Sequence, residues 1–136
     1  MAESSVKNRE VEYISNPCLT KTPPDHTYGL LDDPNSHIKA ARYGKIITLM
    51  CDDGRITVEN EKDLGWNTIA TLKSDIRPAP SYSNFVYIAG VDNRAGTQAA
   101  STALNMRIKT SGEIQVYIFS DKRTVGPRFS VAYPSA

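Results

Sequence analysis

From residue 44 onward, apolar and polar residues alternate along much of the chain. The clearest stretch is residues 103–119, where the alternation runs on both sides of Ser111-Gly112. A period of two is typical of a half-buried β-strand, and a two-residue loop that carries glycine suits a tight hairpin. The pattern therefore predicts an antiparallel hairpin with its turn at Gly112.

Similar short runs predict further strands, and they cover residues 45–51, 55–58, 66–72, 84–91 and 128–133. Asp52-Asp53-Gly54 has the composition of a hairpin turn between the first two of these strands. Residues 92–97 and 121–127 are predicted loops. About seven short strands, separated by turns at intervals of roughly ten residues, predict an all-β protein: an antiparallel β-sandwich or barrel of jelly-roll type.

Residues 1–43 have a different character, because they contain four prolines and few clustered apolar side chains. We expect an extended N-terminal arm, with one short strand at Val11, Tyr13 and Ile14. A short helix is expected at its end, since Asp33 suits an N-cap, Pro34 the first helical position and Gly44 the exit. The chain is thus predicted to divide into an arm with a short helix (1–43) and a β-domain (44–136).

Composition and charge narrow the function classes. The chain has 136 residues, 40% hydrophobic and 23% charged, with no apolar run long enough to cross a bilayer and no apolar leader after Met1. We therefore expect synthesis in a cytoplasm and no membrane partner. Residues 69–136 carry eight Lys/Arg against four Asp/Glu, but these cations are dispersed. Nucleic-acid binding needs clustered cations, so no nucleic-acid partner is expected.

The sequence does not predict a catalytic or metal site. Cys18, His26, His37 and Cys51 lack the short paired spacings of a zinc site, and both cysteines are expected to be thiols, with Cys51 buried. Histidine occurs only in the first 43 residues, and no nucleophile elbow is present. A glycan hydrolase would use paired carboxylates, and the candidates are Asp32, Asp33, Asp52, Asp53 and Asp75. However, Asp33 is better explained as a cap and Asp52-Asp53 as a turn. We expect no enzyme activity and no cofactor.

The predicted loops hold the candidate ligand-binding residues, Asn93, Arg94 and Arg123. Amide and guanidinium groups form directional hydrogen bonds to sugar hydroxyls, and arginine also clamps phosphate. Trp66, the sole tryptophan, could stack on a sugar, but its place before an apolar strand favours a core role. Strand 66–72 directs inward either Trp66 or the pair Ile69 and Leu72.

The order of several motifs resembles a known family. It runs from Gly44-Lys45-Ile46-Ile47-Thr48-Leu49 through the strand at Trp66, Arg77-Pro78 and the hairpin at Gly112 to a terminal Ala132-Tyr133-Pro134-Ser135. This order is similar to that in the head domain of tail-tip receptor-binding proteins from siphophages of Gram-positive bacteria, the lactococcal type in particular. The size and the proline-bearing arm also resemble a small protein encoded near the tail genes of a Bacillus siphophage.

The resemblance implies a bacteriophage tail protein, made in the host cytoplasm and carried in the virion tail, that forms homotrimers and binds host cell-wall saccharide during host adsorption. Other phage tail proteins would be its partners. Two departures stand out: Lys73 follows Leu72 where the family tends to have proline, and the long N-terminal anchoring portion is missing. The alternative is a structural or assembly protein that binds no ligand and whose arm links subunits.

Overall fold

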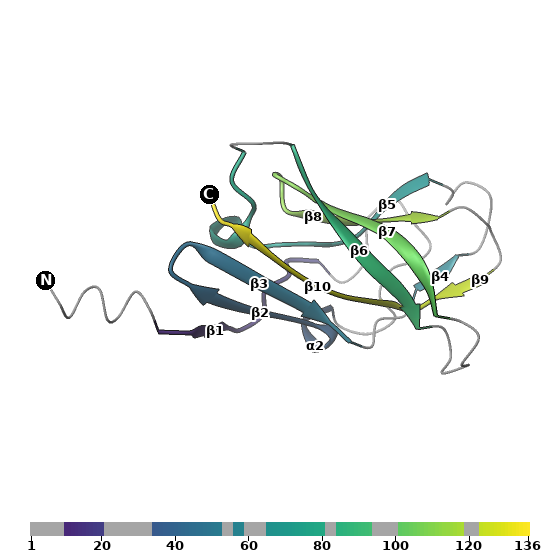
Figure 1. Ribbon diagram of the computed structural model, residues 1–136, viewed down its shortest axis with the longest axis horizontal. Coiled ribbons are helices and arrows are strands. Elements are labelled where there is room, and N and C mark those ends of the chain that lie inside the picture. Colours follow the sequence, from purple (N-terminus) through teal and green to yellow (C-terminus); the bar gives the residue numbers. More distant parts are fainter. Residues whose placement is uncertain are drawn as a thin grey trace, which may run out of the picture.

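Strands make up most of the described chain. The computed structural model describes residues 10–20, 34–52, 56–58, 65–80, 84–93, 101–118 and 123–136. Eight strands form one antiparallel sheet in the order β1-β2-β3-β10-β6-β7-β8-β5 (Figure 1). They are β1 (Glu12–Ile14), β2 (Ile38–Tyr43), β3 (Ile46–Cys51), β5 (Gly65–Thr71), β6 (Phe85–Asn93), β7 (Ser101–Lys109), β8 (Glu113–Ile118) and β10 (Pro127–Pro134). A separate ribbon pairs β4 (Ile56–Val58) with β9 (Arg123–Val125), and two short helical turns are α2 (Pro34–His37) and η2 (Ser74–Ile76).

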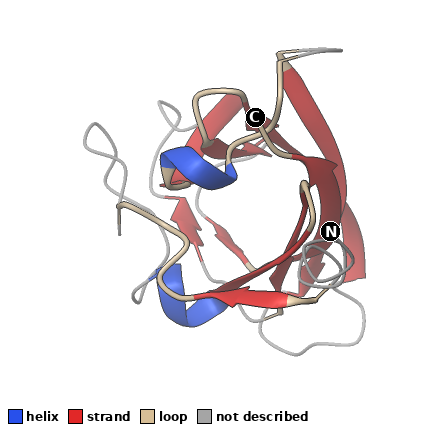
Figure 2. Ribbon diagram, turned by 90° about the vertical axis from the view of Figure 1, so that its left-hand side faces the viewer, coloured by secondary structure: helices blue, strands red, loops and turns tan. Residues whose placement is uncertain are grey.

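The large sheet curls around its own core as a half-barrel, so the predicted all-β antiparallel class is confirmed, with a single sheet (Figure 2). β10 joins the two halves of the curl. It pairs with β3 along Phe129–Pro134 and with β6 at Pro127 and Arg128. The two ends of β10 thus belong to different strand pairs, which lets the sheet bend around the apolar side chains.

Alternation along the strands builds the core. In β3, Ile47, Leu49 and Cys51 point inward. Every second residue also points inward in β7, starting at Leu104, and in β8, starting at Ile114. A fully buried aliphatic side chain of this kind stabilises a fold by about 1.5–3 kcal/mol. The buried apolar residues are Cys18, Ile38, Ala40, Ile47, Leu49, Cys51, Ile69, Ala70, Leu72, Ile76, Ile88, Leu104, Met106, Ile108, Ile114, Val116, Ile118, Phe129 and Tyr133.

The two edges of the curled sheet meet over one short stretch. Cys18, just after β1, forms a bridge with Leu72, just after β5. Backbone hydrogen bonds run from Leu19 N to Thr71 O at 2.6 Å and from Lys73 N to Pro17 O at 3.1 Å. Segments far apart in the chain therefore satisfy each other's backbone groups, which would otherwise stay exposed at two sheet edges.

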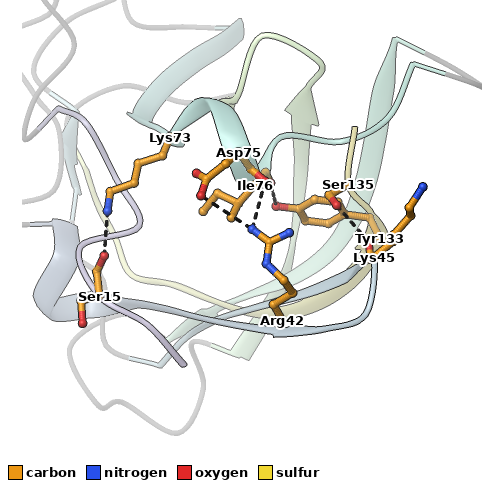
Figure 3. A network of polar contacts seen from close by, with 8 residues as sticks. All are labelled: Ser15, Arg42, Lys45, Lys73, Asp75, Ile76, Tyr133 and Ser135. Atoms are coloured by element: carbon orange, nitrogen blue, oxygen red, sulfur yellow. Dashed lines mark hydrogen bonds and ion pairs between the residues drawn. The ribbon is translucent and has the colours of Figure 1, made fainter. Parts of the chain in front are cut away.

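A polar network fixes the C-terminal segment at one end of the half-barrel (Figure 3). The buried Tyr133 hydroxyl donates to Ile76 O at 2.6 Å, and Ser135 donates its backbone N–H and its hydroxyl to Lys45 O. Burial raises the pKa of Tyr133 well above its usual value, so the phenol stays protonated and able to donate. Arg42 adds a hydrogen bond to Asp75 O and an ion pair with the Asp75 carboxylate.

The predicted helix is wrong beyond His37. A single turn begins at Pro34 as expected, but Ile38–Tyr43 is strand β2, paired with β1 on one side and with β3 on the other. Ile38 and Ala40 are buried while Lys39 is exposed, which is strand alternation. The β2–β3 hairpin turns at Gly44, whose φ of 60° suits glycine. The predicted boundary at 43/44 therefore lies inside a hairpin.

Three further turn predictions are corrected. β3 does not pair with residues 56–58; β4 pairs with β9 instead, so residues 123–125 of the predicted loop are a strand. The β7–β8 hairpin is confirmed, but its loop has three residues, Thr110–Gly112, closed by a hydrogen bond from Gly112 N to Lys109 O. The predicted strand at residues 11–14 and the other strands between residues 45 and 134 are confirmed.

Candidate functional site

One outer surface of the sheet gathers aromatic and polar side chains on β5, β6, β7 and β8. We call it the aromatic face. Its residues alternate along each strand with residues that point into the core, so they share the opposite side of the sheet. The aromatic face consists of Trp66, Thr68, Phe85, Tyr87, Arg107, Lys109, Glu113, Gln115 and Tyr117.

Cross-strand register brings the aromatic rings together. Trp66 lies opposite Tyr117, with ring centroids 5.3 Å apart in an edge-to-face arrangement. Phe85 and Tyr87 are two residues apart on β6, with centroids 5.8 Å apart. Tyr87 is 65% exposed and Tyr117 is 39% exposed. The face thus offers apolar ring surface to solvent beside the partly buried Trp66.

Arg107 occupies the centre of this cluster. Its guanidinium carbon lies 4.0 Å from the Trp66 ring centroid and 4.2 Å from the Phe85 ring centroid. Two rings therefore lie against the guanidinium, one from β5 and one from β6. Such cation–π contacts contribute about 0.5–2 kcal/mol each and fix the plane of the guanidinium.

A chain of hydrogen bonds runs from Arg107 on β7 to the Glu113 carboxylate on β8. Arg107 Nε donates to Gln115 Oε1 at 2.7 Å, and Gln115 Nε2 donates to Thr68 Oγ1 at 3.1 Å. Thr68 Oγ1 in turn donates to Glu113 Oε1 at 3.3 Å. Each donor in this series points towards the Glu113 carboxylate. The series of hydrogen bonds therefore fixes the orientation of the Gln115 amide and of Arg107.

Glu113 and Lys109 form an ion pair at the margin of the face, 3.1 Å apart. Partial burial alone would raise the pKa of Glu113, but hydrogen bonds from Lys109, Ser111 and Thr68, with the Lys109 charge, outweigh it and lower the pKa. The carboxylate is therefore ionised at neutral pH. The Glu113 carboxylate forms its ion pair with Lys109, and among the described residues it forms none with Arg107.

This arrangement is suited to binding a ring-shaped polar ligand. Exposed aromatic rings stack against the apolar faces of sugars, while fixed amide and guanidinium donors read hydroxyl or acidic groups. Trp66 is half-buried on this face, so the core role that the sequence favoured for it is wrong; Ile69 and Leu72 of the same strand are the residues directed inward.

The structure does not test the predicted ligand-binding residues. Asn93 is the last residue of β6 and Arg123 the first of β9, but their side chains lie outside the described part, as does the whole of Arg94. The start of the first predicted loop lies next to the end of the second, because the buried Asp92 carboxylate accepts a hydrogen bond from Gly126 N at 2.9 Å. Asn93, Arg94 and Arg123 stay a prediction.

Other sequence candidates are placed without forming a site. Cys18 and Cys51 are both buried and form no disulfide. No group of three or more potential metal ligands occurs within the ranges that the structure describes. Among the candidate carboxylates, Asp52 is exposed and Asp75 pairs with Arg42, while Asp32, Asp33 and Asp53 lie outside the described residues.

Comparison with known proteins adds no assignment. No protein-family model matches the chain, and no curated protein is significantly similar to it. Of the helices in the described ranges, none has the length and apolar character needed to span a membrane.

Proposed function

We propose that this protein is a non-enzymatic bacteriophage tail protein with a receptor-binding-type head fold, and that its aromatic face binds saccharide of the host cell wall. The observation that carries the proposal is the cluster of Trp66, Phe85, Tyr87 and Tyr117 around a fixed Arg107 on an outer face. Cross-strand aromatic pairs also stabilise an ordinary sheet. Four rings gathered with one fixed cation on an outer face suit a ligand with apolar faces and polar edges.

Exposed tyrosines on the two halves of the sheet provide a matched test. We expect Tyr87→Ala to weaken binding of soluble wall fragments by about tenfold, because it removes stacking surface equivalent to roughly 1.4 kcal/mol. Tyr13, 83% exposed on the outer side of β1, is the control, and Tyr13→Ala should change the dissociation constant less than twofold. Calorimetry with soluble fragments measures affinity per protomer, so avidity from oligomers does not enter.

Both substitutions remove an exposed side chain, so thermal melts should stay close to that of the parent protein. Equal weakening by the two variants, or no weakening by either, contradicts the placement of the site on the aromatic face. Detection of the protein in purified phage particles by antibody tests the tail assignment separately. A signal confined to infected-cell lysate would contradict that assignment.

The other half of the sheet favours a second role. The outer side of β1, β2 and β3 exposes Tyr13, Tyr43, Ile46 and Met50, with Met50 52% exposed. Small residues, among them Ala41 and Ala132, lie between them in the cross-strand register. Lys39 and Thr48 also lie among them. Several exposed apolar side chains on one side of a sheet are a feature of interaction sites. This surface supports the proposed homotrimer and equally the alternative, a structural or assembly protein that links subunits without a ligand.

Light scattering of the full chain distinguishes these roles when combined with the wall-binding assay. Trimers that bind wall fragments support the first role, and oligomers that bind none support the second. A chain beginning at Gly44 is unsuitable for this test, because it would lose β1 and β2 from the sheet. A monomer at micromolar concentration would contradict both oligomeric versions.

A further inference from the structure

We infer that Arg107 recognises an acidic group, a phosphate or a carboxylate, on the ligand of the aromatic face. This inference rests on the proposed function and specifies its ligand class. The site it uses is the outward edge of one guanidinium, between Trp66 and Phe85, on the solvent side of the sheet.

The charge balance of the aromatic face is the first argument. Lys109 and Glu113 neutralise each other at 3.1 Å. Arg107 contacts Trp66, Phe85 and Gln115, none of which carries a charge. Among the described residues, no carboxylate lies within ion-pair distance of Arg107. A half-buried cation without a counter-charge is a costly feature that a bound anion would relieve.

The geometry of the guanidinium is the second argument. Its central carbon lies 4.0 Å and 4.2 Å from two ring centroids, and its Nε–H is used by Gln115 at 2.7 Å. In the described part of the protein, neither Nη group donates a hydrogen bond. What remains is a pair of parallel donors along one edge, and this fork matches the two oxygens of a carboxylate or phosphate.

Preorganisation is the third argument. Gln115 is only 8% exposed, and its amide is held by Thr68, which is held by Glu113. Arg107 is thus fixed by two rings and by a hydrogen-bond chain before any ligand arrives. A fixed fork loses little side-chain entropy on binding, and this favours a charged, bidentate partner over a neutral hydroxyl.

Trp66 supplies the readout, because it is the sole tryptophan and lies against Arg107. We expect millimolar inorganic phosphate to change Trp66 fluorescence, while chloride at the same ionic strength does not. Arg107→Met should abolish the change. Lys39→Met removes one positive charge from an exposed side chain on β2, in the other half of the sheet, so it should preserve the response.

Polymers then distinguish the acidic groups. The probes are poly(glycerol phosphate), polygalacturonate as the carboxylate polymer, and dextran as the neutral control. We expect at least one acidic polymer to bind ten times more tightly than dextran. Arg107→Met and Arg107→Lys should remove that preference, since lysine keeps the charge but not the fork. Lys39→Met should stay within twofold of the parent.

The outcomes separate the two proposals. If wall fragments bind but dextran equals the acidic polymers, or if Arg107→Met and Lys39→Met weaken binding equally, saccharide binding stands and recognition by Arg107 is overturned. If neither wall fragments nor any polymer binds, both are overturned. Should Arg107→Met fail to fold, the phosphate titration of the parent protein and of Arg107→Lys decides, and an absent phosphate response overturns the inference.

Discussion

Replacing Tyr133 with alanine is expected to lower the free energy of unfolding by about 3–5 kcal/mol, the range for truncating a large buried side chain. Tyr133 is only 2% exposed and lies in β10, the strand that joins the two halves of the sheet. Its hydroxyl also donates to Ile76 O at 2.6 Å and so ties η2 to the core. Alanine would leave a cavity and an unpaired carbonyl.

Tyr133→Phe separates these two effects. It keeps the ring and loses only the hydrogen bond, so we expect a loss of about 1–2 kcal/mol. Urea denaturation of the three proteins measures both values. If phenylalanine destabilised the protein as much as alanine, packing of the ring would contribute little, contrary to the core described above.

Replacing Gly112 with alanine is expected to destabilise the protein by about 2–5 kcal/mol, which combines backbone strain with a steric clash. Gly112 has a φ of 93°, a conformation that other residues rarely adopt. A Cβ atom would lie 2.9 Å from Leu72 O and 2.7 Å from Arg77 Nε. Leu72 N also donates to Gly112 O at 2.9 Å, so the loop is docked and cannot easily retreat.

Gly65 is the matched control for this substitution. Its φ of 95° is nearly the same, but a Cβ atom there would meet nothing within 4 Å. Gly65→Ala should therefore show the backbone cost alone, about 1–2 kcal/mol. Thermal and urea unfolding of both variants give the comparison. Equal losses would mean that the docking of the hairpin loop against Leu72 adds nothing to stability.

Local alternation was enough to predict most strands, but which strands pair with each other depends on residues far apart in the sequence. Residues 38–43 contain good helix formers, yet burial of Ile38 and Ala40 and pairing on both sides make them a strand. The turn residues after Cys51 indicated a local hairpin, whereas β4 pairs with β9, much later in the chain. Tertiary pairing outweighed local propensity in both places.

The aromatic face was harder to foresee for two physical reasons. A bulge between Thr68 and Ala70 shifts the phase of β5, so Leu72 points inward although simple alternation would put it on the same side as Trp66. The contact between Arg107 and Trp66 crosses β8, and it exists only because β5 lies beside β8. Alternation over residues 103–119 put Arg107 and Gln115 on the polar sides of their own strands. It could not show that these sides lie next to Tyr87 and Trp66, because that depends on the strand order.

The central claim is that the outer face of β5, β6, β7 and β8 is the ligand-binding surface of this protein. The most direct measurement is an NMR titration of the isotope-labelled chain with soluble host-wall fragments. We predict shifts at the Trp66 indole N–H, the Arg107 side chain and the Gln115 amide, with little change on the outer side of β1–β3. Shifts confined to residues 94–100 and 119–126, or no shifts at all, would contradict it.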